Sequence, residues 1–197
     1  VETEYPWSGE IAIRVDSAPE KDTRLAFRIP GWVSEAEFTV NGNLVEASAV
    51  APGYVGGTRT WKAGDSIEVW FPMKPRIIEA NPQAEHCVNQ IAVMRGPILY
   101  CLESVDLPEK VVFDDVLVPS DIELEPESTD LPFGTIALTG RALVRRRNGQ
   151  GEKEIDRPGA MWGGDLYREH RPAPLQPIPI RLIPYYAWAN RGKGSMS

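Results

Sequence analysis

The sequence contains little cysteine, little histidine and no long apolar run. Two of its 197 residues are Cys and two are His. Two cysteines cannot build a disulfide scaffold, and without further ligands they cannot close a structural zinc site. No stretch approaches the roughly 20 apolar residues of a membrane-spanning helix, and no basic-then-apolar signal sequence opens the chain, so we expect no membrane as partner.

The sequence also lacks a surplus of basic residues. Its 21 Lys and Arg residues stand against 28 Asp and Glu residues, which gives a formal net charge of −7. Phosphate binding requires basic side chains gathered on one face, so we expect no nucleic acid as partner. The hydrophobic fraction of 42% is high enough for a packed core, and the length suits one large or two small domains.

Residue spacing marks no catalytic or metal-binding constellation. The adjacent residues His86 and Cys87 would point to opposite faces of a strand, and Cys101 and His170 stand apart from them. No phosphate-binding loop, dinucleotide fingerprint or nucleophile motif is present, and no pair of acids is distinguished from the rest. The residues therefore predict no catalytic, cofactor-binding or metal-binding side chain.

Alternating apolar residues indicate short strands, each with one buried face. Turn signals such as Pro30-Gly31 and Asn41-Gly42 separate the strands, and no window shows a helical period. The pattern predicts an all-β fold with two antiparallel β-sandwich domains. The alternating sets are Ile11, Ile13 and Val15; Leu25, Phe27 and Ile29; Phe38 and Val40; Ile67, Val69 and Phe71; and Ile91 and Val93.

Residues 91–102 indicate a hairpin with a two-residue turn at Arg95-Gly96. This register places position 94 opposite 97 and 93 opposite 98. Both faces of the hairpin are then apolar, which predicts cover on both sides. Cys101 would lie opposite Gln90, roughly 10 Å from Cys87, too far for a disulfide, so we expect two free thiols, each packed as a small hydrophobe.

The composition changes after residue 104. Residues 105–130 carry nine acids and one base, whereas residues 141–157 carry six bases and three acids. Strands of opposite charge side by side would stabilise each other. Residues 171–179 indicate a Pro-rich connector, and the apolar segment 180–188 resembles the first hundred residues. We therefore predict a first sandwich from residues 1–104 and 178–197, with a second sandwich, 105–177, inserted before its last strand.

Trp70 is the one side chain that we single out for a role in binding. The strand 66–71 directs Ile67, Val69 and Phe71 to the core, so Trp70 must point outward. An outward tryptophan can be an interface anchor, a partly exposed structural residue or a platform for stacking a sugar. The residues alone leave these three roles open. Trp7, Trp32 and Trp188 lie near predicted strand ends or turns, which is typical of packing residues.

Six segments together resemble one family. In their order they are similar to the region that follows the catalytic barrel in glycoside hydrolase family 127, the β-L-arabinofuranosidase family. The resemblance covers most of residues 1–104 and 178–192 and is weak between them. The segments are Tyr5-Pro6-Trp7, Arg28-Ile29-Pro30-Gly31-Trp32, Val40-Asn41-Gly42, Trp61-Lys62-Ala63-Gly64-Asp65, residues 95–103 (RGPILYCLE) and residues 183–192 (IPYYAWANRG).

The resemblance implies that the catalytic machinery lies elsewhere. In that family a helical barrel precedes this region and carries a zinc ion held by Cys and Glu residues, with one cysteine as nucleophile. Cys87 and Cys101 match neither role, so no catalytic residue is carried over and zinc is expected only in a barrel. The family also has two β-sandwiches after the barrel, the second inserted before a final strand, in line with the composition change.

We therefore expect a non-catalytic accessory part of a longer bacterial glycoside hydrolase. Its partners would be its own N-terminal catalytic barrel, which it would brace, and a second copy of the chain in a homodimer. The alternative is a carbohydrate-binding module for plant polysaccharide, with Trp70 as its platform. A free-standing enzyme that uses surface carboxylates would need a cleft with two acids at hydrolytic spacing. We expect a soluble protein and leave cytoplasm or periplasm open.

Overall fold

The computed structural model describes residues 1–46, 48–51, 53–109, 111–131, 135–145, 167, 174–191 and 194–196. It divides into two compact units, one formed by Val1–Tyr100 and Ser128–Ile136 and the other by Cys101–Glu127 and Ala137–Ser197. Apart from three-residue 3-10 turns, the described elements are all strands, and every recorded pairing is antiparallel. The predicted all-β fold is confirmed. In these described ranges no helix is long and apolar enough to cross a membrane.

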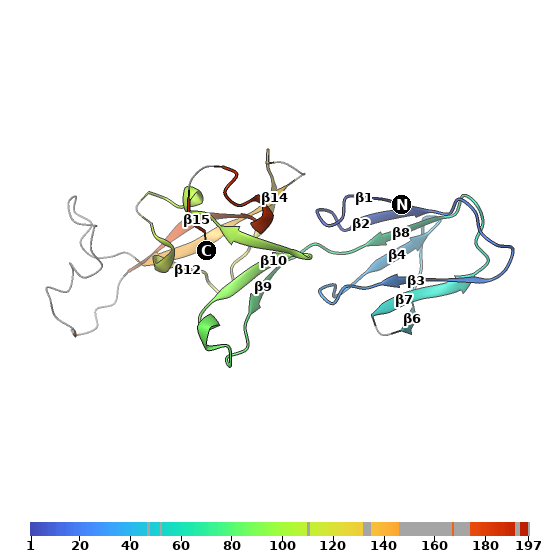
Figure 1. Ribbon diagram of the computed structural model, residues 1–197, viewed down its shortest axis with the longest axis horizontal. Coiled ribbons are helices and arrows are strands. Elements are labelled where there is room, and N and C mark those ends of the chain that lie inside the picture. Colours follow the sequence, from blue (N-terminus) through green and yellow to red (C-terminus); the bar gives the residue numbers. More distant parts are fainter. Residues whose placement is uncertain are drawn as a thin grey trace. The chain divides into compact units, whose positions relative to one another are not determined.

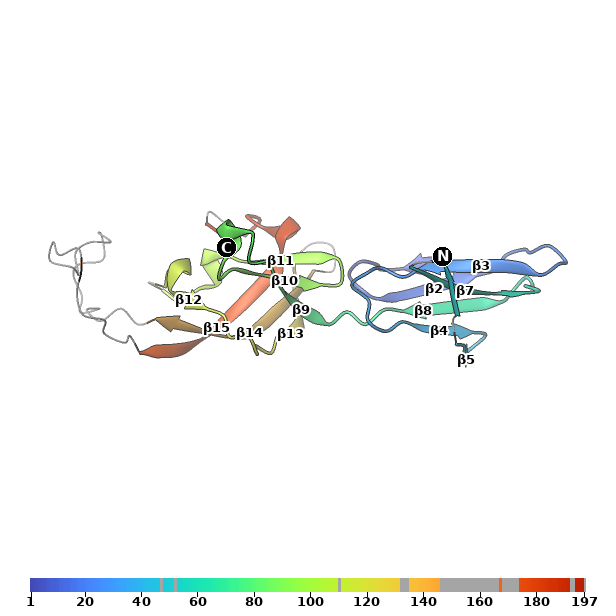
Figure 2. The same cartoon turned by 90° about the horizontal axis from the view of Figure 1, so that it is seen from below.

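Two sheets of the first unit form the layers of a sandwich (Figures 1 and 2). Both contain strands that the alternation predicts, and the edges of the larger sheet are two-residue strands. The five-stranded sheet has the order β1 (Glu2–Thr3), β2 (Glu10–Arg14), β8 (Ser66–Trp70), β4 (Glu37–Val40) and β5 (Asn43–Leu44). The three-stranded sheet has the order β3 (Thr23–Arg28), β7 (Tyr54–Arg59) and β6 (Ser48–Ala51).

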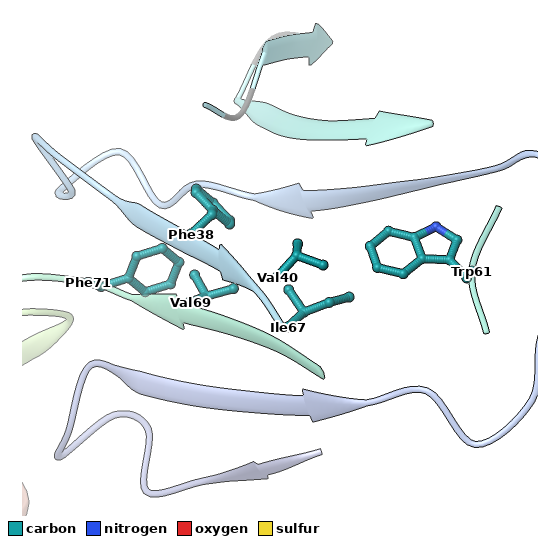
Figure 3. Close-up of a cluster of buried hydrophobic side chains, with 6 residues drawn as sticks. All are labelled: Phe38, Val40, Trp61, Ile67, Val69 and Phe71. Atoms are coloured by element: carbon teal, nitrogen blue, oxygen red, sulfur yellow. The ribbon is translucent and has the colours of Figure 1, made fainter. Parts of the chain in front are cut away.

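The core between these layers consists of the inward-facing half of each strand. Figure 3 shows its buried side chains pointing from β4 and β8 to one side. Leu25 and Phe27 of β3 pack against them from the other layer. Each such aliphatic or aromatic side chain contributes about 1.5–3 kcal/mol when it is fully buried. The cluster comprises Phe38, Val40, Trp61, Ile67, Val69 and Phe71.

A third sheet contains the remaining long strands. Its order is β12 (Val116–Leu117), β14 (Ile136–Arg145), β15 (Leu175–Pro184), β11 (Ile98–Leu102), β10 (Ile91–Arg95) and β9 (Pro75–Glu79), and β13 (Glu125–Ser128) also pairs with β14. The short 3-10 turns are η1 (Glu85–Cys87), η2 (Ser104–Asp106), η3 (Phe113–Asp115) and η5 (Tyr185–Ala187). Thus β13, from the acidic stretch, lies beside β14, whose last residue, Arg145, belongs to the basic stretch; residues 146–157 lie outside the described ranges.

The predicted connector over 171–179 is wrong from Leu175 onward, where β15 begins. Its pairing with β14 runs from Leu138 opposite Leu182 to Arg145 opposite Leu175. The strand contains Pro177 and Pro179, which signal a connector in a sequence because proline lacks the N–H of a ladder. Alternate residues direct their N–H groups to the same neighbouring strand, so these two prolines remove donors on one side only.

The predicted register of the β10–β11 hairpin is wrong by two residues. Arg95 pairs with Ile98 and Val93 with Tyr100, so the turn is Gly96-Pro97. Gly96 has a φ of 57°, which glycine adopts without strain and other residues rarely adopt. Because side chains alternate with a period of two, the shift leaves every predicted face unchanged. On one face Val93, Ile98, Tyr100 and Leu102 are buried and Ile91 is exposed. On the other face Cys101 is buried and Leu99 is exposed.

Strand pairing groups the residues differently from the predicted domains. We predicted residues 1–104 and 178–197 as one sandwich and 105–177 as an insert. In the structure β9, β10 and β11 belong to the sheet that contains β12 and β14, and β15 pairs with β14 along its length. Hydrogen bonds therefore join strands across the predicted boundaries, while the limits of independently folding domains stay a prediction.

The close contact of β3 with β7 gives a stability test with a neighbouring control. A Cβ at Gly56 would lie 2.0 Å from the Leu25 carbonyl oxygen, whereas nothing lies within 4 Å of one at Gly57. We expect Gly56→Ala to lower the free energy of unfolding by about 1–3 kcal/mol or more, because the strands must separate locally. Gly57→Ala should change it by less than about 1 kcal/mol. Urea denaturation measures both, and equal effects would contradict the close approach.

Candidate functional site

Trp70 lies on the outer face of β8, as the alternation predicts. Its neighbours Ile67 and Val69 are buried at 1% and 3% exposure, whereas Trp70 is 42% exposed. β8 is the central strand of its sheet, with β2 on one side and β4 on the other. Trp70 therefore lies on the central strand of this outer face, at the end of that strand.

The two flanking strands place acids beside Trp70. Glu10 of β2 and Glu37 of β4 are its Cα partners on either side. One row along, Glu68 lies between Ala12 and Thr39, and the Thr39 hydroxyl donates to Glu68 Oε2 at 3.0 Å. This face is hollowed by a cavity of about 450 Å³, which we call the Trp70 groove. It is lined by Glu10, Ile11, Ala12, Glu37, Thr39, Glu68, Val69 and Trp70.

A hydrogen-bonded turn holds β4 against β8. Asn41 Nδ2 donates to Asp65 Oδ1 at 2.9 Å, and the Ser66 backbone N–H donates to Asn41 Oδ1 at 2.9 Å. The Asn41 bond and the Lys62 backbone N–H hold the pKa of Asp65 below its ordinary value. These bonds therefore stabilise the fold above the ordinary pKa of Asp, and their contribution is lost as the pH falls through the lowered value. They join two of the segments that carry the family resemblance.

The second unit presents an exposed aromatic group at the end of β15. Tyr185, Tyr186 and Trp188 are 47%, 46% and 38% exposed, and they follow the fully buried Ile183 and Pro184. The rings of Tyr185 and Trp188 stack with centroids 6.4 Å apart and an interplanar angle of 22°. We call residues 185–188 the aromatic turn. Trp188, predicted to be a packing residue, is thus a half-exposed member of a surface group.

Three buried charges hold the chain directly after the aromatic turn. Arg191 Nε donates to Glu103 Oε2 at 2.9 Å, its Nη1 donates to Asp106 Oδ1 at 2.8 Å, and its Nη2 donates to both carboxylates. The side chains of Arg191, Glu103 and Asp106 are only 19%, 5% and 10% exposed. These bonds, with Asp106 as the larger cause, raise the pKa of Arg191 above its ordinary value, so its guanidinium group stays charged.

Backbone hydrogen bonds extend this cluster to neighbouring segments. The Ala189 N–H donates to Glu103 Oε1 at 2.8 Å, directly after the aromatic turn. The Ser104 N–H donates to the Ser195 carbonyl at 2.9 Å, and Glu103 forms a bridge with Met196. Sequence reasoning missed this cluster, although Glu103 and Arg191 both lie in segments that resemble the family, because nothing in one sequence pairs residues so far apart.

The cysteines and histidines do not assemble into a site. Both thiols are free, as predicted, but Cys87 is exposed and only Cys101 is buried. Burial, and secondly the charge of Glu103, raises the pKa of Cys101 to about 11. Across the described residues no three His, Cys, Asp or Glu side chains gather as a metal site would require. These residues therefore do not fit the zinc that the resemblance implies for the family, and His170 lies outside the described ranges.

Comparison with known proteins identifies the chain. The model of the β-L-arabinofuranosidase middle domain of glycoside hydrolase family 127 matches residues 1–73, and that of the family's C-terminal domain matches residues 75–197. These matches define the non-barrel region of a glycoside hydrolase. The chain belongs to glycoside hydrolase family 127, and the resemblance seen in the sequence is confirmed.

Similar proteins are much longer than this chain. A non-reducing end β-L-arabinofuranosidase of Bifidobacterium longum subsp. longum is 32% identical over 98% of the chain and 28% of its own length. A crystal structure of a family 127 β-L-arabinofuranosidase from Geobacillus stearothermophilus T6 has a TM-score of 0.83 at 36% identity, over 99% of this chain and 29% of that one. Another solved structure, described as a glycoside hydrolase, has a TM-score of 0.82 at 40% identity, over 100% of this chain and 30% of that one. The chain therefore spans less than a third of the length of these relatives.

The buried ion cluster predicts a large effect of removing its cation. Arg191→Met would leave Glu103 and Asp106 as buried carboxylates without their partner, so we expect a loss of about 3–5 kcal/mol in the free energy of unfolding. The control is Arg181→Met. Arg181 and Glu127 lie 3.7 Å apart, with side chains 35% and 51% exposed, and such pairs contribute less than about 1 kcal/mol. Urea denaturation measures both variants; a similar small loss for each would show that the cluster does not stabilise its unit.

The two thiols should differ in reactivity. A thiolate is the reactive form, and Cys101 is buried with a pKa raised to about 11, whereas Cys87 is exposed. At about pH 8 we expect an aromatic disulfide reagent to modify one thiol per folded chain and two per unfolded chain. The variant Cys87→Ser should lose the fast reaction. Rapid modification of Cys101 in that folded variant would contradict its burial.

Proposed function

We propose that the chain is the non-catalytic accessory region of a family 127 glycoside hydrolase and that it braces the catalytic barrel through the aromatic turn. The observation that carries this proposal is the exposure of stacked aromatic rings on a segment anchored by buried charges. Large aromatic side chains gathered at a surface are typical of interaction sites. The relatives supply a candidate occupant, because more than two thirds of their length lies outside the part that this chain matches.

The energetics of docking favour an anchored aromatic surface as the contact that braces the barrel. Rings of Tyr and Trp bury a large area, and each Å² of apolar area removed from water contributes about 25 cal/mol. The stacking of Tyr185 on Trp188 and the bond from Ala189 to Glu103 restrict the turn before it binds. Little conformational entropy is then lost on docking, so a larger share of the burial energy remains as affinity.

The absence of catalysis in this region is supported by its acids. Glu10 and Glu37 flank Trp70 as its Cα partners on the two neighbouring strands. Both are exposed, whereas the general acid of a glycosidase pair ordinarily occupies a desolvated site. We therefore propose that hydrolysis, and the zinc expected from the resemblance, belong to the catalytic part of the longer protein.

A second candidate function is carbohydrate binding. Its supporting observation is the half-exposed ring of Trp70 over a cavity of about 450 Å³. An exposed ring in a groove is a platform on which the apolar face of a sugar can stack. This function uses a surface other than the aromatic turn, so the two candidates can be separated by substitution.

A chimera tests the accessory role. The matching region of the Geobacillus stearothermophilus relative would be replaced by residues 1–197 of this chain, and arabinofuranosidase activity and Tm would be measured. We expect an active chimera, no turnover by the isolated chain, and a drop in Tm of about 4 °C or more with Trp188→Ser, because apolar contact area is lost. Tyr54→Ser is the control, since Tyr54 is also an exposed aromatic residue, at 41%.

Three outcomes would overturn parts of this proposal. Turnover by the isolated chain would contradict a non-catalytic region. Equal effects of Trp188→Ser and Tyr54→Ser would contradict docking through the aromatic turn. A change of oligomeric mass in light scattering, with Tm and activity unchanged, would instead assign the turn to contact between two copies of the chain.

A further inference from the structure

The charged side chains that line the Trp70 groove are all negative. Among its lining residues are three carboxylates, Glu10, Glu37 and Glu68, and no base. Within the described part of the chain no Lys or Arg forms an ion pair with any of the three. The base on the same face is Arg14, which lies opposite Ser66 at the end of β2 and outside the lining. An occupant therefore meets uncompensated negative charge on both sides of the ring.

The hydrogen-bonding groups of the groove are almost all acceptors. Ionised carboxylates only accept, and the one hydroxyl, on Thr39, already donates to Glu68. Among the lining side chains the indole N–H of Trp70 is then the donor that is left. A sugar hydroxyl both donates and accepts, so a sugar would find few donors here. A guanidinium or ammonium group only donates, and its positive charge is attracted to the face of an indole ring. The lining thus matches a cation better than a neutral sugar.

We propose that the Trp70 groove binds the cationic side chains of a basic protein segment. A guanidinium group over the ring of Trp70 would donate to Glu10 on one side and to Glu37 on the other. The strand order β2-β8-β4 sets this arrangement, since each glutamate is the direct Cα partner of Trp70. Glu68, one row along, offers a second anion to the next cationic side chain of an extended segment.

This inference stands independently of the proposed accessory role, whereas it competes with carbohydrate binding for the same groove. The groove is built from β2, β4 and β8, whereas the aromatic turn follows β15. Loss of cation binding would leave docking through the aromatic turn untouched, and the reverse also holds. The charge of the groove also predicts its salt response, because exposed ion pairs weaken as the Debye length falls from about 10 Å at 0.1 M salt.

Titration of the full chain followed by NMR tests the proposal. The indole N–H signal of Trp70 would be assigned by its absence in Trp70→Phe, and the probe is an acetylated tri-arginine amide. We expect the chemical shift of this signal to change on titration and to give a Kd for the probe of about 1 mM or below at low salt. Affinity should fall about tenfold or more in Glu10→Gln/Glu37→Gln and about fivefold or more when salt rises from about 0.05 M to about 0.5 M.

Matched controls separate this site from general attraction to an acidic chain. The variant Glu20→Gln/Glu79→Gln removes the same net charge from exposed positions outside the groove and should keep full affinity. A tri-citrulline amide has nearly the shape of the probe without its charge and should not bind. Each variant's two-dimensional amide spectrum shows whether it is folded.

Several results would overturn the proposal. These are an unmoved Trp70 signal at about 10 mM probe, an equal response to tri-citrulline, or unchanged affinity in Glu10→Gln/Glu37→Gln. An equal loss in the two double variants would assign the effect to net charge alone. Salt-independent binding of a neutral arabino-oligosaccharide, without binding of tri-arginine, would assign the groove to carbohydrate instead.

Discussion

The contact of Arg191 with Glu103 and Asp106 is the constraint on which the unit of residues 101–127 and 137–197 depends. A buried cation between two buried anions adds little net stability compared with apolar packing, because all three charges lose hydration. The cluster instead makes the fold specific, since any arrangement that separates the three charged side chains leaves a charge uncompensated in a poorly hydrated site. The end of β11, the turn η2 and the chain after β15 therefore have one favourable arrangement.

This anchoring explains how an aromatic turn can be both exposed and ordered. The turn lies between two fixed points, the buried Ile183 and Pro184 on one side and Arg191 on the other. Aromatic rings on an unanchored segment would bury more of their apolar area by packing onto the nearest apolar surface. Here the backbone between the fixed points is short, so Tyr185 and Trp188 instead stack on each other and leave about half of their surface in solvent.

Local alternation predicted β2, β3, β4, β8 and β10 but missed β7 and β9, and it could not predict which strands pair. Alternation predicted that Trp70 points outward, because the direction of a side chain depends only on its own strand. The acids beside it depend on the strand order β2-β8-β4, which no single strand encodes. For the same reason Glu103 and Arg191, 88 residues apart, were not paired. The prolines of β15 led to the wrong prediction of a connector. A proline lacks a backbone N–H, but the loss disrupts a sheet only where the neighbouring strand would accept that hydrogen bond.

The two surfaces differ in the physics that would govern their contacts. Burial of the aromatic turn depends on apolar area, which ordinary changes in salt affect little. Attraction to the Trp70 groove depends on charge and is screened over about 8 Å at physiological ionic strength. Apolar area supplies affinity, whereas complementary charge mainly accelerates encounter and discriminates between partners. The two proposed contacts would therefore respond differently to salt, the groove losing its partner and the turn keeping its own.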